Sequence, residues 1–309
     1  MATNIEHFVA DYDTDLSQVD EFTTSKEVTG LFREAIAIII KNPLFWLSSI
    51  IILILASMAL FPTLWTSTDP LNCPLTDSAL PASGSHIMGT TLQGCDVFSR
   101  VINGARPSLA IGIMTTIIGT AIGVFIGTLA GFFGGWLDSV LSRVIDIFYA
   151  IPFILAAVAV LQLFESSDSI WKVIFTLSIF AWVGPARLMR SAVLSVKEQE
   201  FITASVSLGA TNKRNMFFHI LPNAISPVIS TATINIGAFI VAESTLSFLG
   251  LGLGSNSVSW GQDIANARDI LVTTPSVLLW PSLFLAVTTL SFIFLGDAIR
   301  DALDPKGRS

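Results

Sequence analysis

Residues 109–133 read LAIGIMTTIIGTAIGVFIGTLAGFF, a run of 25 residues without a single charged side chain. An α-helix needs about 20 apolar residues to cross the ~30 Å hydrocarbon core of a bilayer. A closed β-barrel is the only other spanning architecture, and its strands alternate polar and apolar residues. Continuous apolar runs such as residues 48–55 lack that alternation. The run at residues 109–133 therefore predicts a membrane-spanning helix.

Five further stretches meet the same criterion, which predicts an all-α membrane protein with six transmembrane helices. The six predicted spans are residues 44–61, 109–133, 140–164, 170–189, 224–248 and 277–295. Of the 309 residues, 52% are hydrophobic and only 13% are charged, against roughly 25% charged in soluble domains. So few charges exclude a cytosolic enzyme, a secreted domain and a disordered tail protein. The chain has no basic stripe of the kind that binds nucleic acid.

The basic residues set the predicted orientation. With the N-terminus in the cytoplasm, 12 of the 16 lysines and arginines lie on the cytoplasmic side, as the positive-inside rule requires. Both termini are then cytoplasmic, and the acidic start argues against a cleavable signal peptide. The first span (44–61) is preceded by an acidic tail (1–24) and an amphipathic interfacial helix (25–43). An extracytoplasmic loop (62–108), a core of five spans (109–299) and a short cytoplasmic tail (300–309) follow it.

The only two cysteines, Cys73 and Cys95, both fall in the predicted extracytoplasmic loop. That compartment permits disulfides, so we expect the two to pair. The alternative is two free thiols. A metal site built on cysteine alone would need more ligands than the chain offers.

Five glycines in and after the second span recur at steps of four residues: Gly119, Gly123, Gly127, Gly131 and Gly135. A helix face without side chains lets another helix approach closely. The pattern predicts a packing face, and such close contact is also compatible with helices that slide during a conformational cycle.

The fifth span carries a polar stripe that consists of Ser226, Ser230, Thr233 and Gly237, with Asn235 beside it. Such a stripe fits either a water-filled pathway or hydrogen bonds between helices. Glu243 lies near the outer end of this span, where we expect a structural cap or an ion pair rather than a proton relay. At the start of the third span, the spacing of Arg143 and Asp146 predicts an i,i+3 ion pair.

The longest predicted cytoplasmic segment, residues 197–223, reads as two short helices joined at Gly209. Glu198 and Glu200 suit the N-terminal end of the first helix, and Gly209 can take the left-handed conformation that stops it. Thr211 or Asn212 can cap the second helix, which Pro222 is expected to end. A compact helix–turn–helix that connects two membrane helices is a docking element.

This segment resembles the coupling loop of the permeases of binding-protein-dependent ABC importers. It keeps Ala204, Gly209 and Leu221-Pro222 at the family's intervals. It departs from the family in Thr203, which stands in the place of a Glu, and in Ser205, which stands in the place of an Ala. The residues that the resemblance assigns to ATPase coupling are Glu200, Thr203, Ala204, Ser205, Gly209, Lys213, Arg214, Leu221 and Pro222.

Other segments are similar to the second, C-type permease of dipeptide, oligopeptide and nickel importers. They are residues 89–100, 242–252, 259–261 and 295–305. The resemblance implies a B-type permease partner, one or two ABC ATPase subunits, an extracytoplasmic solute-binding protein and a place in the prokaryotic plasma membrane. ATP and Mg belong on the ATPase subunits, because this chain contains no Gly-Lys pair and so no phosphate-binding Walker loop.

The resemblance covers importers of peptides and of nickel, and the residues of the spans favour peptides as the transported solute. The nickel branch would need His, Met or acidic ligands along the path, and the predicted spans hold few such groups. A secondary transporter or channel usually carries mid-span charges for ion coupling, and none is convincing here. A membrane-embedded enzyme is disfavoured because the three histidines are scattered over tail and loops and form no zinc motif.

Overall fold

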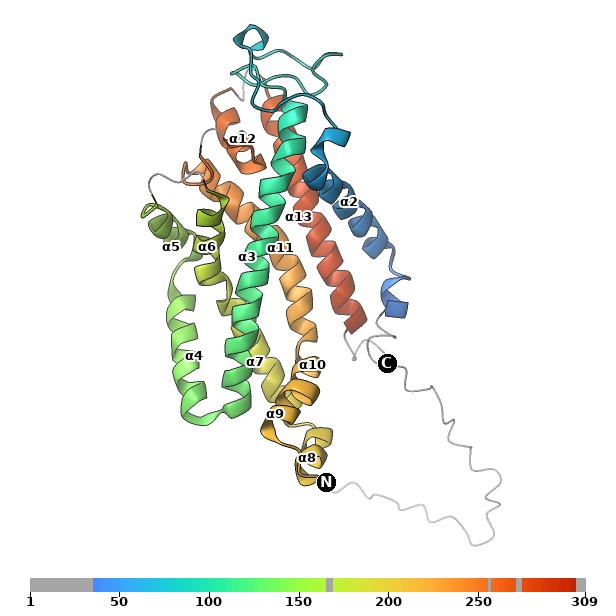
Figure 1. Cartoon of the computed structure of the whole chain (residues 1–309), viewed down its shortest axis with the longest axis vertical. Coiled ribbons are helices and arrows are strands. Elements are labelled where there is room, and N and C mark those ends of the chain that lie inside the picture. Colours follow the sequence, from blue (N-terminus) through green and yellow to red (C-terminus); the bar gives the residue numbers. More distant parts are fainter. Residues whose placement is uncertain (1–35, 165–168, 255–256, 271–273, 304–309) are drawn as a thin grey trace, which may run out of the picture.

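The computed structural model describes residues 36–164, 169–254, 257–270 and 274–303, which form an elongated bundle of helices (Figure 1). The long helices are α2 (Pro43–Leu60), α3 (Val97–Phe133), α11 (Ser226–Phe248) and α13 (Ser276–Leu303). Shorter helices complete the bundle: α4 (Gly135–Ala150), α5 (Phe153–Leu161), α6 (Ile170–Ala181), α7 (Val183–Lys197) and α12 (Trp260–Ala267). The acidic tail, most of the interfacial helix and the end of the C-terminal tail lie outside the described residues.

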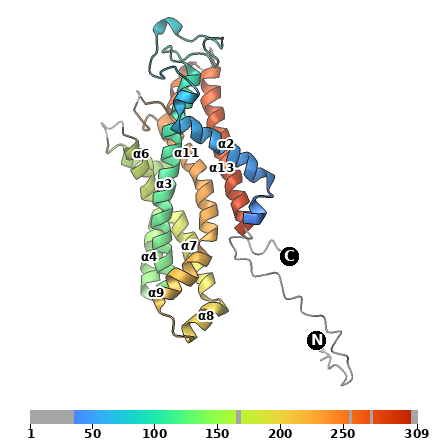
Figure 2. The ribbon, with the colours of Figure 1, turned by 45° about the vertical axis from the view of Figure 1, so that its right-hand side comes forward.

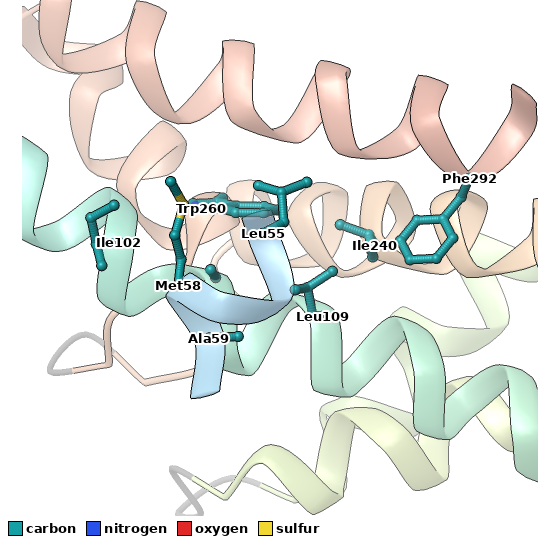
Figure 3. Packing of buried hydrophobic residues seen from close by; sticks show 9 residues of the cluster. Leu55, Met58, Ala59, Ile102, Leu109, Ile240, Trp260 and Phe292 are labelled. Carbon is teal, nitrogen blue, oxygen red and sulfur yellow. The ribbon is translucent and has the colours of Figure 1, made fainter. Parts of the chain in front are cut away.

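The arrangement of the bundle follows from α3, which runs along its whole length (Figures 1 and 2). On one side α3 packs along α6 and α7, and on the other it packs against α11 and α2. α13 lies between α2 and α11 and contacts both. Leu55 of α2, Ile102 and Leu109 of α3, Ile240 of α11 and Trp260 of α12 form one buried apolar cluster (Figure 3).

By length and hydropathy, five helical stretches in the described part of the chain can cross a membrane: α2, α3, α11, α13, and α6 taken together with α7 (Ile170–Lys197). A bent pair, α4 with α5, can make a sixth span. The bent pair corrects the prediction of one continuous helix over residues 140–164. α4 ends at Ala150, α5 begins at Phe153, and their axes differ by 82°. The reason is Pro152, because a proline excludes the preceding residue from the helical conformation and supplies no N–H. Ile151 is accordingly extended, with ψ at 124°.

The second predicted span starts earlier than hydropathy indicated. α3 begins at Val97 and has 37 residues, which at ~1.5 Å per residue is about 55 Å and longer than a bilayer core is thick. Asp96 caps this helix, since its carboxylate accepts a hydrogen bond from the Ser99 amide at 2.8 Å. The last 12 residues of the predicted extracytoplasmic loop (97–108) are therefore helical and form about three turns of α3.

Four of the five glycines of the predicted packing face lie where α3 meets α6 and α7. A methyl group placed on Gly119, Gly123 or Gly131 would lie within 2.6–2.8 Å of an atom of the opposing helices. Gly127 is packed equally closely, against Ala186 and Met189. Gly135 departs from the predicted face because α3 ends at Phe133, and Gly135 turns the chain into α4 with a φ of 57°.

The acids near the membrane have other partners than local spacing indicated. Asp146 pairs with Arg187 of α7 at 2.5 Å and not with Arg143 of its own helix. Among the described residues, Glu243 has no ion-pair partner and caps no helix. It is fully buried and accepts hydrogen bonds from Ser247 at 2.8 Å and from Ser259 at 3.1 Å. Glu243 thus connects α11 to the segment that leads into α12.

Candidate functional site: the coupling hairpin and the outer cap

The predicted helix–turn–helix is present at one end of the bundle, opposite the end that carries α12 (Figure 1). Its first arm is α8 (Glu200–Ser207), and its second arm begins with α9 (Asn212–Arg214). Gly209 between them has a φ of 81°, a conformation that costs glycine little and other residues much. Thr211 caps the second arm by accepting a hydrogen bond from the Arg214 amide. We call residues 198–224 the coupling hairpin.

Pro222 does not end the second arm, which corrects the prediction from sequence. After α9 the chain forms a π-helical turn (Asn215–Ile220) and then α10 (Leu221–Ala224), which leads into α11 with a break at Ile225. Pro222 is the second residue of α10, a position where the missing N–H costs little. The second arm is therefore almost continuous with the fifth span.

The hairpin is packed against the ends of two other helices. Ile202, Met216 and Ile220 are buried in a cluster with Met189 and Val193 of α7 and with Phe132 at the end of α3. The Lys197 ammonium donates a hydrogen bond to the Phe132 carbonyl oxygen at 2.7 Å, where a cation is favourable at a helix C-terminus.

A side-chain hydrogen bond joins the two arms of the hairpin. The Ser205 hydroxyl donates to the Asn215 Oδ1 at 2.7 Å, and Asn215 is only 2% exposed. Ser205 is one of the two residues that depart from the family's pattern. Its hydroxyl has a structural use that the alanine usual at this place cannot supply.

The hairpin also exposes large apolar side chains. Leu208 is 88% exposed and Phe218 is 75% exposed, and Phe201, Val206 and Phe217 are exposed as well. Lys213 and Arg214 lie between them on the surface, as do Glu200, Thr203 and Ala204 of the first arm. Large exposed apolar side chains are common at surfaces that contact a partner. Sequence reasoning did not single out Leu208, Phe218 or Asn215. Leu208 and Phe218 are apolar residues within a polar loop, which is a usable signal, whereas nothing local marks Asn215.

The polar residues of the fifth span separate in space. Ser230 is 2% exposed and lies on the side of α11 that packs against Gly296 of α13. Ser226 and Thr233 are half-buried. Asn235 alone of the four lines a groove of about 480 Å³, together with side chains of α5, α6 and α7.

The opposite end of the bundle carries a cap, which is formed by the loop that the sequence predicts to be extracytoplasmic. Cys73 and Cys95 form a disulfide, as predicted. The Ser99 hydroxyl donates to the Thr68 carbonyl oxygen, and the Arg100 guanidinium donates to the Pro70 carbonyl oxygen at 3.2 Å. These bonds hold the loop on the N-terminal end of α3.

Arg100 also forms a buried ion pair with Asp263 of α12, in which its Nε donates to Oδ1 at 2.7 Å. Each side chain is less than a tenth exposed. Burial raises the pKa of the Asp263 carboxyl, and the neighbouring guanidinium opposes that rise. The pair joins residues that are 163 positions apart, so that it fixes the cap to α12.

A bundle of this kind with a hairpin between its fourth and fifth spans defines a membrane component of a transport system. Residues 123–309 match the family model described as binding-protein-dependent transport system inner membrane component, and the chain belongs to that family.

Three curated relatives are permeases of transport systems for peptides or glutathione. The chain is 34% identical to the oligopeptide transport system permease protein OppC of Bacillus subtilis, over 92% of each chain. It is 38% identical to the dipeptide transport system permease protein DppC of the same organism, over 87% of this chain and 83% of DppC. It is 44% identical to the glutathione transport system permease protein GsiD of Salmonella typhimurium, over 72% of each.

Among solved structures, the chain is similar to one from the MetNI methionine ABC transporter in an inward-facing conformation. The TM-score is 0.57 and the identity 23%, over 66% of this chain and 96% of that chain. This likeness shows the permease fold.

Proposed function

We propose that the chain is the permease subunit that forms half of the translocation pathway of an ATP-driven peptide importer. The observation that carries the proposal is the coupling hairpin, which is anchored to α3 and α7 through a buried cluster and exposes Leu208 and Phe218 outward. A rigidly anchored element with an exposed apolar surface can transmit the movement of a partner to the bundle. The resemblance of its sequence to a coupling loop supports an ABC ATPase, carrying ATP and Mg, as that partner.

The packing of the bundle suggests how movement spreads. The hairpin contacts α7 through Met189 and Val193, and α7 lies on the glycine face of α3. Arg190 of α7 forms a two-pronged ion pair with Asp138 of α4, at 2.5 and 2.7 Å. Helices that are packed so closely move as one body. ATP binding closes the ATPase pair, tilts this body and opens the pathway outward, and hydrolysis resets it inward.

The groove beside Asn235 is the best candidate for the part of the pathway that this subunit lines. Its other walls include Phe153, Phe180, Phe239 and Thr245, so it offers one carboxamide and mostly apolar surface. Such a lining suits peptides of varied side chains and offers no set of nickel ligands. The B-type permease subunit would supply the other half, and a solute-binding protein would deliver the peptide to the end that carries the cap.

The relatives support peptides as the substrate class, because OppC, DppC and GsiD are named for oligopeptide, dipeptide and glutathione transport. Charge distribution supports an orientation with the hairpin and both termini in the cytoplasm. The orientation places the disulfide in the oxidising compartment.

The test is transport by the complete complex in liposomes, with ATP inside and the binding protein outside. We expect uptake of di- or oligopeptides that stops without ATP. Leu208→Asp and Phe218→Asp should each abolish uptake and lower the amount of ATPase that co-purifies. Leu163→Asp is the control, because Leu163 is similarly exposed (80%) but lies outside the hairpin. It should leave the co-purification of the ATPase unchanged. Uptake driven by an ion gradient without ATPase, or ATP hydrolysis stimulated by nickel and not by peptides, contradicts the proposal.

A further inference from the structure

The cap exposes three leucines next to its disulfide. Leu71 and Leu75 stand on either side of Cys73 in the sequence, and Leu92 precedes Cys95 by three positions. Leu75 is 78% exposed, Leu71 is 58% exposed and Leu92 is 49% exposed. Single apolar side chains are normal at a protein surface, whereas several that lie together are common at interaction sites. We call these three residues the leucine patch.

The two segments that carry the leucine patch are joined to each other. The disulfide connects the segment of Leu71 and Leu75 to the segment of Leu92. The Ser78 hydroxyl donates a hydrogen bond to the Leu92 carbonyl oxygen at 2.6 Å. A methyl group on Gly94 would lie 3.5 Å from the Leu75 amide nitrogen, so the segments are also in contact. The backbone of the patch is therefore held in place, and a partner that binds there has little of it to order.

The leucine patch lies beyond the outer end of the first span. α2 ends at Leu60, and Met58 of its last turn shares a buried cluster with Ile102 of α3. Cys95 precedes Ile102 by seven residues, which places the disulfide roughly 10 Å further out along α3. Between Leu71 and α12 lies a cavity of about 290 Å³. If α2 spans the bilayer, the patch therefore lies in water beyond it.

The charges around the leucine patch select the kind of partner. Residues 62–99 contain three aspartates and neither lysine nor arginine. Two of the aspartates border the patch, because Asp69 lies two residues before Leu71 and Asp77 lies two residues after Leu75. Complementary charge on a partner means lysine or arginine. Anionic lipid headgroups attract basic segments and so are not attracted by this acidic loop.

The size of the leucine patch fits a partner that docks and leaves. A stable interface buries about 800 Å² on each partner, and three leucine side chains cover less. A partner permease or a second copy of this chain would be a permanent neighbour and would need a larger surface. We propose that the leucine patch docks the solute-binding protein, through an apolar surface of that protein that is bordered by lysine or arginine. The inference rests on the proposed function.

The test measures docking on the complete complex in nanodiscs. The probe is the solute-binding protein that sustains uptake, labelled with a fluorophore, and the Kd is obtained from fluorescence anisotropy. Leu75→Asp and Leu92→Asp should each raise the Kd at least about tenfold, because each replaces an apolar contact by a carboxylate that must lose water. Leu64→Asp is the matched control, because Leu64 is 79% exposed and lies in the same loop outside the patch. It should change the Kd by less than about threefold.

A second variant tests the charge and keeps the shape of the cap. Asp69→Asn removes one negative charge but retains the oxygen that accepts a hydrogen bond from the Leu71 amide at 2.9 Å. Association should slow at least about twofold at low salt, and the difference should vanish at high salt. Asp301→Asn makes the same chemical change at an exposed site of α13 and should leave the association rate unchanged.

An unchanged Kd in both leucine variants overturns the inference, as does an equal rise in Leu64→Asp or an unchanged association rate of Asp69→Asn at low salt. Loss of the partner permease from the Leu75→Asp complex, with an unchanged Kd, also overturns it and assigns the patch to the permease pair. Formation of the disulfide reports on folding of the cap in each variant.

ATP-driven peptide uptake by the complete unmodified complex separates the inference from the proposed function. If uptake is normal and the leucine variants bind the solute-binding protein as tightly as the unmodified complex does, only the docking surface is wrong. If uptake is absent, the proposed function is wrong.

Discussion

Replacement of Ser205 by alanine tests whether the two arms of the coupling hairpin are held together by one hydrogen bond. The change restores the residue that the family usually has at this place, yet we expect it to destabilise this chain. Its partner, Asn215, is only 2% exposed, so its Oδ1 would be left buried and without the 2.7 Å bond from the serine hydroxyl. Water reaches such an atom only if the arms separate.

The size of the effect follows from that burial. A buried acceptor that loses its donor costs about 1–3 kcal/mol, which corresponds to a ~5- to ~150-fold rise in the equilibrium constant for opening of the hairpin. Ser207→Ala is the matched control. Ser207 lies two positions further along the same helix and donates to the Thr203 carbonyl oxygen of its own arm at 3.0 Å, at an exposed site. Its loss should change opening by less than about threefold.

Hydrogen exchange of the hairpin amides, measured by mass spectrometry on the permease in nanodiscs, reports the opening equilibrium directly. The double variant Ser205→Ala/Asn215→Leu removes both partners and should recover much of the lost protection, because no polar atom is then stranded. Equal exchange in Ser205→Ala and Ser207→Ala would refute the reasoning, as would strictly additive effects of the changes at positions 205 and 215.

Three further perturbations test other parts of the bundle. Gly123→Ala places a methyl group 2.6 Å from the opposing helix and should lower the free energy of unfolding in detergent by about 1–3 kcal/mol. Gly184→Ala is the control, because nothing lies within 4 Å of that position, and it should leave the stability unchanged. Equal effects of the two changes would contradict the close packing. Cys95→Ser removes the disulfide between Cys73 and Cys95 and should lower the stability of the cap by about 3 kcal/mol in the chain-entropy model. The measurement is the rate of proteolysis of the loop, which should rise. A rate equal to that of the oxidised protein would show that the disulfide does not stabilise the loop. Glu243→Ala leaves its serine donors without an acceptor and should lower the free energy of unfolding by about 1–3 kcal/mol. Glu243→Gln keeps an acceptor oxygen and should cost less, so its melting temperature should be the higher of the two. The reverse order would contradict this role of Glu243.

Hydrophobic runs and local signals predicted much of the architecture from sequence. The first span is expected at residues 44–61, and a helix is found at Pro43–Leu60, because 18 consecutive uncharged and mostly apolar residues have no other stable environment than lipid or a protein core. Gly209 marks the turn of the hairpin because a positive φ is a property of one residue and its neighbours. The disulfide between Cys73 and Cys95 was predictable because no other cysteine competes.

Relations between distant residues were decided only by the tertiary structure. Asp146 pairs with Arg187 of α7 and not with Arg143, which is closer in sequence. Ser230 lies on the side of α11 that packs against α13, whereas Asn235 lines a groove. The cavity beside the Arg100–Asp263 ion pair arises where a loop, α3, α12 and α13 meet. Hydropathy and turn signals act within one or two helical turns and so can be read along the chain. Ion pairs, packing faces and cavities depend on which helices become neighbours, and that choice belongs to the packing of the whole bundle.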